Sequence, residues 1–257
     1  MQELKTQPTA GREVLKRELL TIGFTANDMV SAIPWYVDTA LEVLGIPIPV
    51  PSDYPTCLSH LLGREIWKST LGQVEADLAD GKFQEIFIKP AEGAKGFSGM
   101  IVCGPFDEQI SGEWGLLNPE IYPLVSSSGG RLMPVHCSET VDMNSEYAVY
   151  VVNDSIRHIS HYMCKKSSCR CADGDRATKG DPVLHLNMDV VLDAVRRMSE
   201  SKETESLKGY RADFVLARKS GEEEYQTILC EVNDGYVSGR YDDFSPSDFA
   251  DMSIARF

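Results

Sequence analysis

The stretch "YRADFVLARKSGEEEYQTILCEVNDGY", residues 210–236, places four polar side chains inside two apolar runs. Both runs are rich in aliphatic, aromatic and β-branched residues, and the polar segment "KSGEEE" separates them, so we expect two strands joined as a hairpin. The first run carries Arg211 and Asp213, and the second carries Glu231 and Asn233. Because strand residues two positions apart share a face, such a hairpin would bring all four side chains together.

These four side chains suit a metal ion and a polyphosphate. Two carboxylates and an amide oxygen are hard ligands for Mg²⁺, which prefers few protein ligands completed by water and substrate phosphate. Arg211 beside them would neutralise negative charge that develops on a phosphoryl or acyl-phosphate group. A solvated strand face with incidental ion pairs is the alternative, but charged residues are depleted in strands and here interrupt two apolar runs.

Composition narrows the class of protein. The chain has 257 residues, 42% of them hydrophobic and 25% charged, which is ordinary for a globular protein of one large or a few small domains. The formal net charge of -14 argues against general binding to nucleic acid or to an anionic membrane, but leaves room for a small anionic ligand. No stretch approaches the ~20 apolar residues of a membrane span, and residues 1–20 lack the apolar core of a signal peptide. We therefore expect a cytoplasmic protein with reduced cysteines.

Hydrophobic periodicity predicts an α+β chain. The expected helices cover 26–48, 57–81 with a break near Gly63 or Gly72, 186–209, and 247–257 with Ser247 as N-cap. The expected strands lie within 83–91 and 99–104, in a hairpin (or a short helix and a strand) within 120–139, and in a hairpin around "NDS" over 145–164. The strand-rich middle would form a separate small lobe.

A glycine-rich segment follows a lysine in this middle part. Lys89 ends an expected strand, and "AEGAKGFSG", residues 91–99, supplies free backbone N–H groups that can fold over phosphates. A plain hairpin turn explains the segment equally well, and the P-loop pattern is absent. The sequence also lacks GxSxG, HExxH and GxGxxG, which are typical of serine hydrolases, zinc proteases and dinucleotide-binding enzymes.

Histidines and cysteines gather in "IRHISHYMCKKSSCRC", residues 156–171. The candidate zinc ligands are His158, His161, Cys164, Cys169 and Cys171. Their spacing does not form two matched pairs, and two histidines three apart on a strand would face opposite ways, so we favour a basic strand end with reduced thiols. A second interpretation is that Lys165, Lys166 and Arg170 meet an acidic substrate.

From about Lys68 to Tyr241 the motifs, taken in order, resemble those of the ATP-grasp superfamily, and in particular its compact, poorly characterised stand-alone domains. "REIWKST" resembles the helix that bears a first phosphate-binding lysine, Lys68, and "IFIKP" resembles the strand that bears the second, Lys89. "AEGAKGFSG" resembles the flexible loop that closes on the triphosphate. The resemblance implies ATP-binding roles there for Lys95, Gly96, Ser98 and Gly99.

The rest of the resemblance concerns the nucleoside and the metal. "CSETVDMNSEY" resembles the hinge, where Glu139, Thr140 and Val141 would hold the adenine and Glu146 would bind the ribose. "YRADF" and "LCEVN" resemble the family's Arg-x-Asp and Glu-x-Asn pairs. The resemblance implies that the metal ligands are Asp213, Glu231 and Asn233, and that Arg211 stabilises the transition state.

The resemblance implies an ATP-grasp fold of two α+β lobes with ATP bound between them. It divides the chain into a short N-terminal α/β region at 1–66, a small lobe at 67–142 and a large lobe with the metal and catalytic residues at 143–257. It also implies a Mg²⁺-dependent, ADP-forming ligase that joins a carboxylate to an amine or thiol through an acyl phosphate. The acceptor would be a small carboxylate or a peptide, with Arg240 and Tyr241 as candidate contacts, and no nucleic acid or membrane is expected as a partner.

Two alternatives stay open. A small-molecule kinase would use the same lobes and the same nucleotide residues. A non-catalytic nucleotide-binding or zinc-binding interaction protein would belong to another class, although binding alone would not require Arg211 together with three metal ligands.

Overall fold

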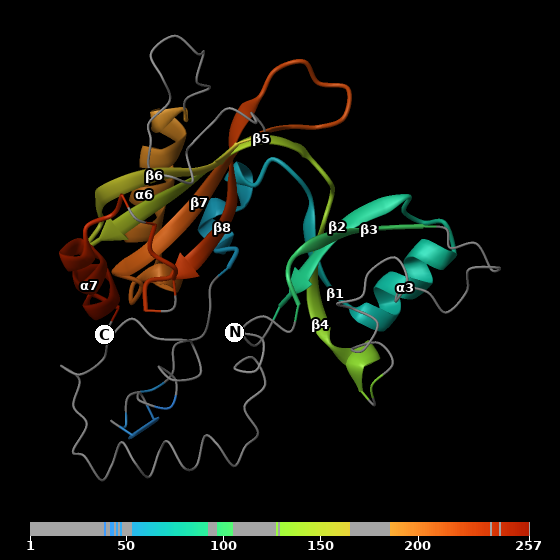
Figure 1. Cartoon of the computed structure of the whole chain (residues 1–257), viewed down its shortest axis with the longest axis horizontal. Helices are drawn as coiled ribbons and strands as arrows, with labels where there is room; N and C mark the ends of the chain where they lie inside the picture. The colour runs from blue at the N-terminus through green and yellow to red at the C-terminus, as the bar shows by residue number, and fades with distance from the viewer. Residues whose placement is uncertain are drawn as a thin grey trace. The chain divides into compact units, whose positions relative to one another are not determined.

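The computed structural model describes most of the chain from Asp53 onward. The described residues are 53–91, 97–104, 127, 129–164, 186–236, 238–241 and 243–256, with isolated positions at 39, 42, 43, 45 and 47. The expected helix over 26–48 therefore lies mostly outside the described residues, as do Lys95 and Gly96. Two four-stranded sheets and several helices confirm the α+β prediction (Figure 1).

The chain divides into two compact units. The small unit combines Leu62–Met143 with Ala217–Gln226, and the large unit combines Met1–Leu61, Asn144–Leu216 and Thr227–Phe257. The three-part division expected from the sequence stays a prediction. Across the described part of the chain, none of the helices has the length and apolar character of a membrane span.

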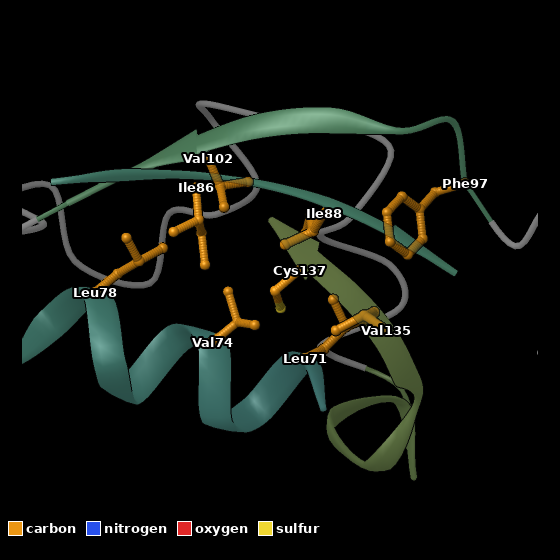
Figure 2. Close-up of a cluster of buried hydrophobic side chains, with 9 residues drawn as sticks. All are labelled: Leu71, Val74, Leu78, Ile86, Ile88, Phe97, Val102, Val135 and Cys137. Carbon is orange, nitrogen blue, oxygen red and sulfur yellow. The ribbon is translucent and has the colours of Figure 1, made fainter. Parts of the chain in front are cut away.

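The small unit is a sheet with a helix packed on one face. Its strand order is β1–β4–β2–β3, with β1 at Ile66–Thr70, β2 at Glu85–Pro90, β3 at Met100–Cys103 and β4 at Pro134–Ser138. Helix α3 covers Leu71–Ala79, and the 3₁₀ turn η4 at Gly130–Leu132 precedes β4, so the expected short helix and strand are found. Figure 2 shows the core between α3 and the sheet, formed by Leu71, Val74, Leu78, Ile86, Ile88, Phe97, Val102, Val135 and Cys137.

Lys68 lies on a strand, so the helix expected around this lysine was wrong. Strand β1 pairs antiparallel with β4 in a register that sets Lys68 opposite His136. Helix α3 begins only after Thr70, whose side chain accepts a hydrogen bond from the backbone N–H of Gln73 at 3.3 Å. The reason is tertiary, because β1 is stabilised by a partner strand far along the chain that local periodicity does not reveal.

The large unit contains the second sheet. Its strand order is β6–β5–β7–β8, with β5 at Asp142–Val152, β6 at Ser155–Cys164, β7 at Gly209–Arg218 and β8 at Gln226–Asp234. Both expected hairpins are confirmed. Asn153 and Asp154 form the turn between β5 and β6, with φ of 48° and 61°, a left-handed conformation that Asn and Asp tolerate better than most residues. Two residues of β6, Arg157 and Tyr162, have no partner in the register with β5 and form β-bulges.

Helix α6 spans Met188–Glu200 and ends earlier than the expected residue 209. Ser201 ends it, because its side chain accepts a hydrogen bond from the backbone N–H of Glu203 and starts a short 3₁₀ turn, η6, at Lys202–Thr204. The polar run after the helix adds no apolar residue to the buried face, so tertiary packing gives the helix no reason to continue. The buried face matches four residues of the expected stripe: Val191, Ala194, Val195 and Met198.

The C-terminal helix α7 spans Pro246–Ile254. Its N-cap is Ser245, so the prediction of Ser247 was wrong. The reason is Pro246, whose missing N–H and fixed φ favour the first helical position and move the cap to the residue before it. The helix packs on the large sheet through a cluster of Ala148, Tyr150, Val152, Phe244, Phe249 and Met252.

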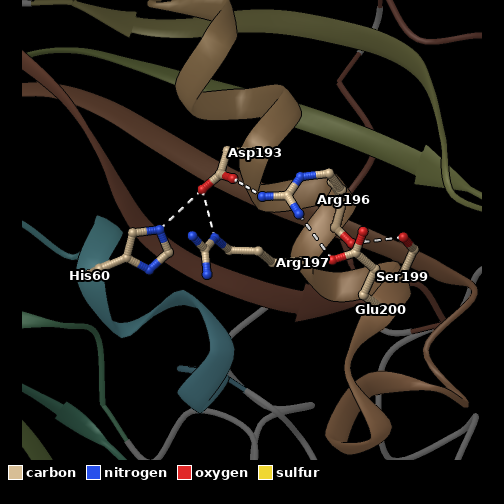
Figure 3. Close-up of polar contacts among 6 residues, drawn as sticks. All are labelled: His60, Asp193, Arg196, Arg197, Ser199 and Glu200. Atoms are coloured by element: carbon tan, nitrogen blue, oxygen red, sulfur yellow. Dashed lines mark hydrogen bonds and ion pairs between the residues drawn. The ribbon is translucent and has the colours of Figure 1, made fainter.

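The 3₁₀ helix η2 at Thr56–Leu61 is joined to α6 by a polar cluster around Asp193 (Figure 3). The Asp193 carboxylate lies 3.1 Å from His60 Nε2 and accepts from Arg197 Nε at 2.8 Å and from Arg196 Nη2 at 2.5 Å. Nearby, the backbone N–H of Thr56 donates to the carboxylate of Glu203. The cluster is largely exposed, so we regard it as an anchor for η2.

Candidate active site

The four residues predicted to converge lie together on β7 and β8. Arg211 donates from Nη2 to Asp213 Oδ2 at 2.7 Å. Asn233 donates from Nδ2 to Asp213 Oδ2 and to Glu231 Oε1, in each case at 2.9 Å. β7 and β8 are neighbours in the sheet, and alternate residues of each strand share a face, which explains how both pairs reach one place.

Asp213 is the buried centre of this group, with only 2% of its surface exposed. Burial raises the pKa of Asp213 to about 7, and the charge of Glu231 raises it further, although the Arg211 guanidinium lowers it. Its Oδ1 is buried and has no hydrogen-bond partner among the described residues. An unpaired buried carboxylate oxygen costs free energy, and a cation is one means of satisfying it.

These side chains fit a magnesium ion. Asp213 has an unsatisfied oxygen, Glu231 supplies a second carboxylate, and Asn233 uses its amide nitrogen on those carboxylates, which leaves its amide oxygen as a ligand atom. Such a site would have few protein ligands, as Mg²⁺ prefers. Within the described ranges, no group of three or more His, Cys, Asp or Glu side chains is arranged to hold a metal, so the fit depends on the asparagine.

Arg211 is held on two sides. Besides Asp213, it donates from Nη1 to the carbonyl oxygen of Gly239 at 3.3 Å, and its guanidinium lies 5.8 Å from the centre of the Tyr241 ring. Burial alone would lower the pKa of Arg211, but the neighbouring Asp213 carboxylate raises it, so the side chain stays cationic. Its Nε is buried without a hydrogen-bond partner in the part of the chain that the structure describes.

Glu146, the predicted ribose ligand, lies on β5 and belongs to the same charged group. Tyr162 donates its hydroxyl to Glu146 Oε2 at 2.6 Å. Burial raises the pKa of Glu146, the Tyr162 hydrogen bond lowers it, and the charge of Glu231 raises it again. Tyr162 also stacks on Tyr241, with ring centroids 4.4 Å apart. Sequence reasoning missed Tyr162, because it reaches Glu146 from a bulge that no local pattern reveals.

Of the predicted acceptor contacts, Tyr241 lies beside this group and Arg240 turns to the backbone. Arg240 donates from Nη1 to the carbonyl oxygen of Phe244 at 2.5 Å and to that of Tyr241 at 3.3 Å. The acceptor roles stay predictions.

In the small unit the two predicted phosphate lysines form one row with a histidine. Lys68 on β1 and Lys89 on β2 both lie opposite His136 on β4, which runs between those strands. Residues directly opposite each other in paired strands point to the same face. This is the face away from α3, because the core residues Ile88 and Cys137 occupy the alternating positions. Sequence reasoning missed His136, since only the register of three strands reveals it.

The described end of the glycine-rich segment is closely packed. A Cβ on Gly99 would lie 2.6 Å from the tip of the Phe87 ring, so a side chain there would displace that ring. Ser98 and Gly99 are described, whereas Lys95 and Gly96 lie outside the described residues.

The predicted hinge residues already have partners in the small unit. Glu139 Oε2 accepts from the Glu65 backbone N–H and from Lys219 Nζ, each at 2.9 Å, and the Lys219 hydrogen bond lowers the pKa of Glu139. Thr140 Oγ1 donates to Glu85 Oε1 at 2.5 Å. The carboxylate of Glu139 thus holds the hinge in place, and contacts to adenine would come from backbone groups here and at Val141.

The two histidines of the zinc candidate lie on opposite faces of β6. His158 lies 3.1 Å from Asp243, whereas His161 stacks on Tyr147 with ring centroids 4.4 Å apart. Cys164 ends the strand, and Cys169, Cys171, Lys165, Lys166 and Arg170 lie outside the described residues. The zinc site stays an untested alternative.

The fold and the convergent polar group define an ATP-grasp protein. The chain belongs to an ATP-grasp domain family, the second family of its clade, whose model matches residues 61–252, more than half of the sequence. No curated protein matches the chain at a significant level.

Solved structures share the fold at low sequence identity. The L-amino acid ligase from Bacillus licheniformis is 14% identical with a TM-score of 0.51, over 98% of this chain and 62% of that one. The D-alanine–D-alanine ligase from Helicobacter pylori is 14% identical with a TM-score of 0.47, over 86% of this chain and 67% of that one. The chain thus spans about two thirds of the length of these enzymes.

Proposed function

We propose that this chain is an ATP-dependent, ADP-forming ligase that joins a carboxylate to an amine or a thiol. The observation that supports it most is the meeting of Arg211, Asp213, Glu231 and Asn233 around a buried carboxylate oxygen that lacks a hydrogen-bond partner in the described chain. A binding protein would gain little from burying Asp213 in this state, whereas phosphoryl transfer needs metal ligands and a fixed cation.

In this proposal the metal ligands are Asp213, Glu231 and Asn233. Mg²⁺, when bound, would supply positive charge against the terminal phosphates of ATP. Arg211 would lie against the transferred phosphoryl group and offset the charge that builds on its oxygens. Because Asp213 and Gly239 hold the guanidinium in place, little reorganisation is needed when the reaction occurs.

The reaction would run in two displacements. A carboxylate oxygen of the substrate attacks the γ-phosphorus, the bond to the ADP oxygen breaks, and an acyl phosphate forms. The amine or thiol then attacks the acyl carbon, inorganic phosphate leaves, and the nucleophile's proton is lost to the surroundings. No protein nucleophile takes part, in agreement with the lack of nucleophile motifs in the sequence.

The remaining predicted residues would bind the nucleotide. Lys68 and Lys89 would contact its phosphates from their shared face, together with Lys95, Gly96, Ser98 and Gly99 of the glycine-rich segment. Glu139, Thr140 and Val141 would hold the adenine and Glu146 the ribose. Since the solved enzymes with this fold include an L-amino acid ligase, we propose an amino acid or a short peptide as the acceptor, with Tyr241 in contact with it.

The test is ADP release by the purified full chain with MgATP across a panel of amino acids, dipeptides and small carboxylates. We expect ADP release that depends on one carboxylate and one nucleophile, with an amide or thioester product by mass spectrometry. Glu231→Gln is the matched control, because it keeps the size of the side chain and removes the charge. A stable phosphorylated acceptor would instead identify a kinase, and no heat of MgATP binding by calorimetry would overturn the proposal.

A further inference from the structure

A buried tyrosine of β5 holds the loop that follows the metal strand. Tyr150 is fully buried, and its hydroxyl accepts from the backbone N–H of Tyr241 at 3.1 Å and donates to the carbonyl oxygen of Gly239 at 3.4 Å. The same Gly239 carbonyl accepts from Arg211 Nη1 at 3.3 Å. One backbone oxygen therefore links a buried phenol to the predicted catalytic arginine.

The loop is tied to β6 as well. Ser160, which is buried, donates to Asp243 Oδ1 at 2.5 Å, and His158 Nε2 lies 3.1 Å from Asp243 Oδ2. A further hydrogen bond runs between the side chains of Ser160 and Tyr150. The loop from Gly239 to Asp243 is thus held by side chains from two neighbouring strands.

Packing alone does not require the hydroxyl of Tyr150. The ring stacks on Phe244 with centroids 4.0 Å apart, and phenylalanine would keep that contact. Burying a hydroxyl is unfavourable unless it is hydrogen-bonded, so the group is explained by what it bonds. Burial raises the pKa of Tyr150, which keeps the hydroxyl protonated as a donor.

We propose that Tyr150 is a positioning residue for Arg211, because its hydroxyl fixes the backbone from Gly239 to Tyr241 and the Gly239 carbonyl then orients the guanidinium. Without it, Arg211 would keep its bond to Asp213 and could pivot about that bond. A misplacement of about 1 Å can cost on the order of 10²-fold in rate. The catalytic consequence rests on the proposed ligase function, whereas the positioning itself does not.

The test compares Tyr150→Phe with Tyr210→Phe. Tyr210 lies on β7, its hydroxyl is also buried, and it has no hydrogen-bond partner among the residues that the structure describes, so its loss should be neutral. In Tyr150→Phe we expect faster amide hydrogen exchange at Tyr241 and a shifted or broadened Arg211 Nε–H NMR signal. Tyr210→Phe should match the wild type in both measurements.

Kinetics add a second measurement. Tyr150→Phe should lower kcat by about 10-fold or more with the KM for ATP nearly unchanged, because a misaligned arginine affects the transition state more than nucleotide binding. Unchanged exchange at Tyr241 or an unchanged Arg211 signal would overturn the inference, and so would equal kcat in the two variants. If the wild type released no ADP, the ligase proposal would fail, and the NMR signal would still decide whether Tyr150 positions Arg211.

Discussion

The amide nitrogen of Asn233 lies 2.9 Å from Oδ2 of Asp213, although the two residues are 20 positions apart in the chain. The same amide donates to Glu231, so one neutral side chain holds two carboxylates that would otherwise repel each other. It occupies Oδ2 of Asp213 and leaves Oδ1 without a hydrogen bond in the described chain. The asparagine therefore arranges the pair for a cation rather than neutralising it.

Asn233→Ala should lower Mg²⁺-dependent turnover by about 10-fold to 100-fold, the usual effect of losing a residue that orients or ligates a metal. Excess Mg²⁺ should restore part of the activity, since the carboxylates remain. The measurement is ADP release against Mg²⁺ concentration, with circular dichroism to follow folding. Gln226→Ala, at the exposed start of the same strand, is the control. Loss of folding in parallel with loss of activity would make Asn233 structural.

Arg211→Lys keeps the positive charge beside Asp213 but removes the planar fork that bonds both Asp213 and Gly239. We expect kcat to fall by about 10²-fold, as when one preorganised donor to a transition state is lost, while the affinity for ATP changes little. Steady-state kinetics and calorimetry together check this. Arg157→Lys on β6 is the control, and an unchanged kcat in Arg211→Lys would remove the residue from the mechanism.

Lys89→Met keeps the apolar stem of the side chain and removes its charge. If Lys89 and Lys68 contact phosphate from their shared row, the affinity for MgATP should fall by about 10-fold, the value of one hydrogen bond to a charged group. Isothermal titration calorimetry measures it. The control is Lys82→Met, whose ammonium pairs with Asp77 in the same unit. Equal affinity in both variants would place Lys89 outside the nucleotide site.

The Asp193 cluster predicts a pH-dependent contribution to stability. Hydrogen bonds from Arg197, His60 and Arg196 lower the pKa of Asp193. A carboxylate with a lowered folded-state pKa stabilises the fold above its ordinary pKa of about 4, and this contribution is lost as the pH falls through the folded-state value. Asp193→Asn should therefore lower the free energy of unfolding at neutral pH, and its difference from the wild type should shrink below about pH 4.

Urea denaturation of both proteins from neutral to acid pH measures this difference. High salt should also reduce it, because the cluster is exposed and screening weakens such pairs. Glu224→Gln removes the same charge from an exposed position and is the control. A difference from the wild type that stays constant across the pH range would refute the electrostatic explanation.

The polar group of the large unit could be predicted from the sequence because its geometry is local. Alternation along two adjacent strands, joined by a short turn, suffices to bring Arg211, Asp213, Glu231 and Asn233 to one face. The row of Lys68, His136 and Lys89 was out of reach, because it depends on the register of three strands.

Other features depend on the path of the chain or on a single neighbour. The bonds of Tyr150 depend on where the loop after β8 returns, and no periodicity encodes that path. The N-cap of α7 was missed by two residues, since the effect of Pro246 on the cap outweighed the capping tendency of Ser247.

The unpaired residues of β6 have a consequence for insertions and deletions in this hairpin. Arg157 fits between the pairs Ile156–Val151 and His158–Tyr150, so its loss would leave both pairs as neighbours in a regular ladder. Loss of Ile159, which is paired, would instead slip the strand by one position and turn Ser160 to the opposite side of the sheet. Natural variation in the length of this strand should therefore be concentrated at position 157.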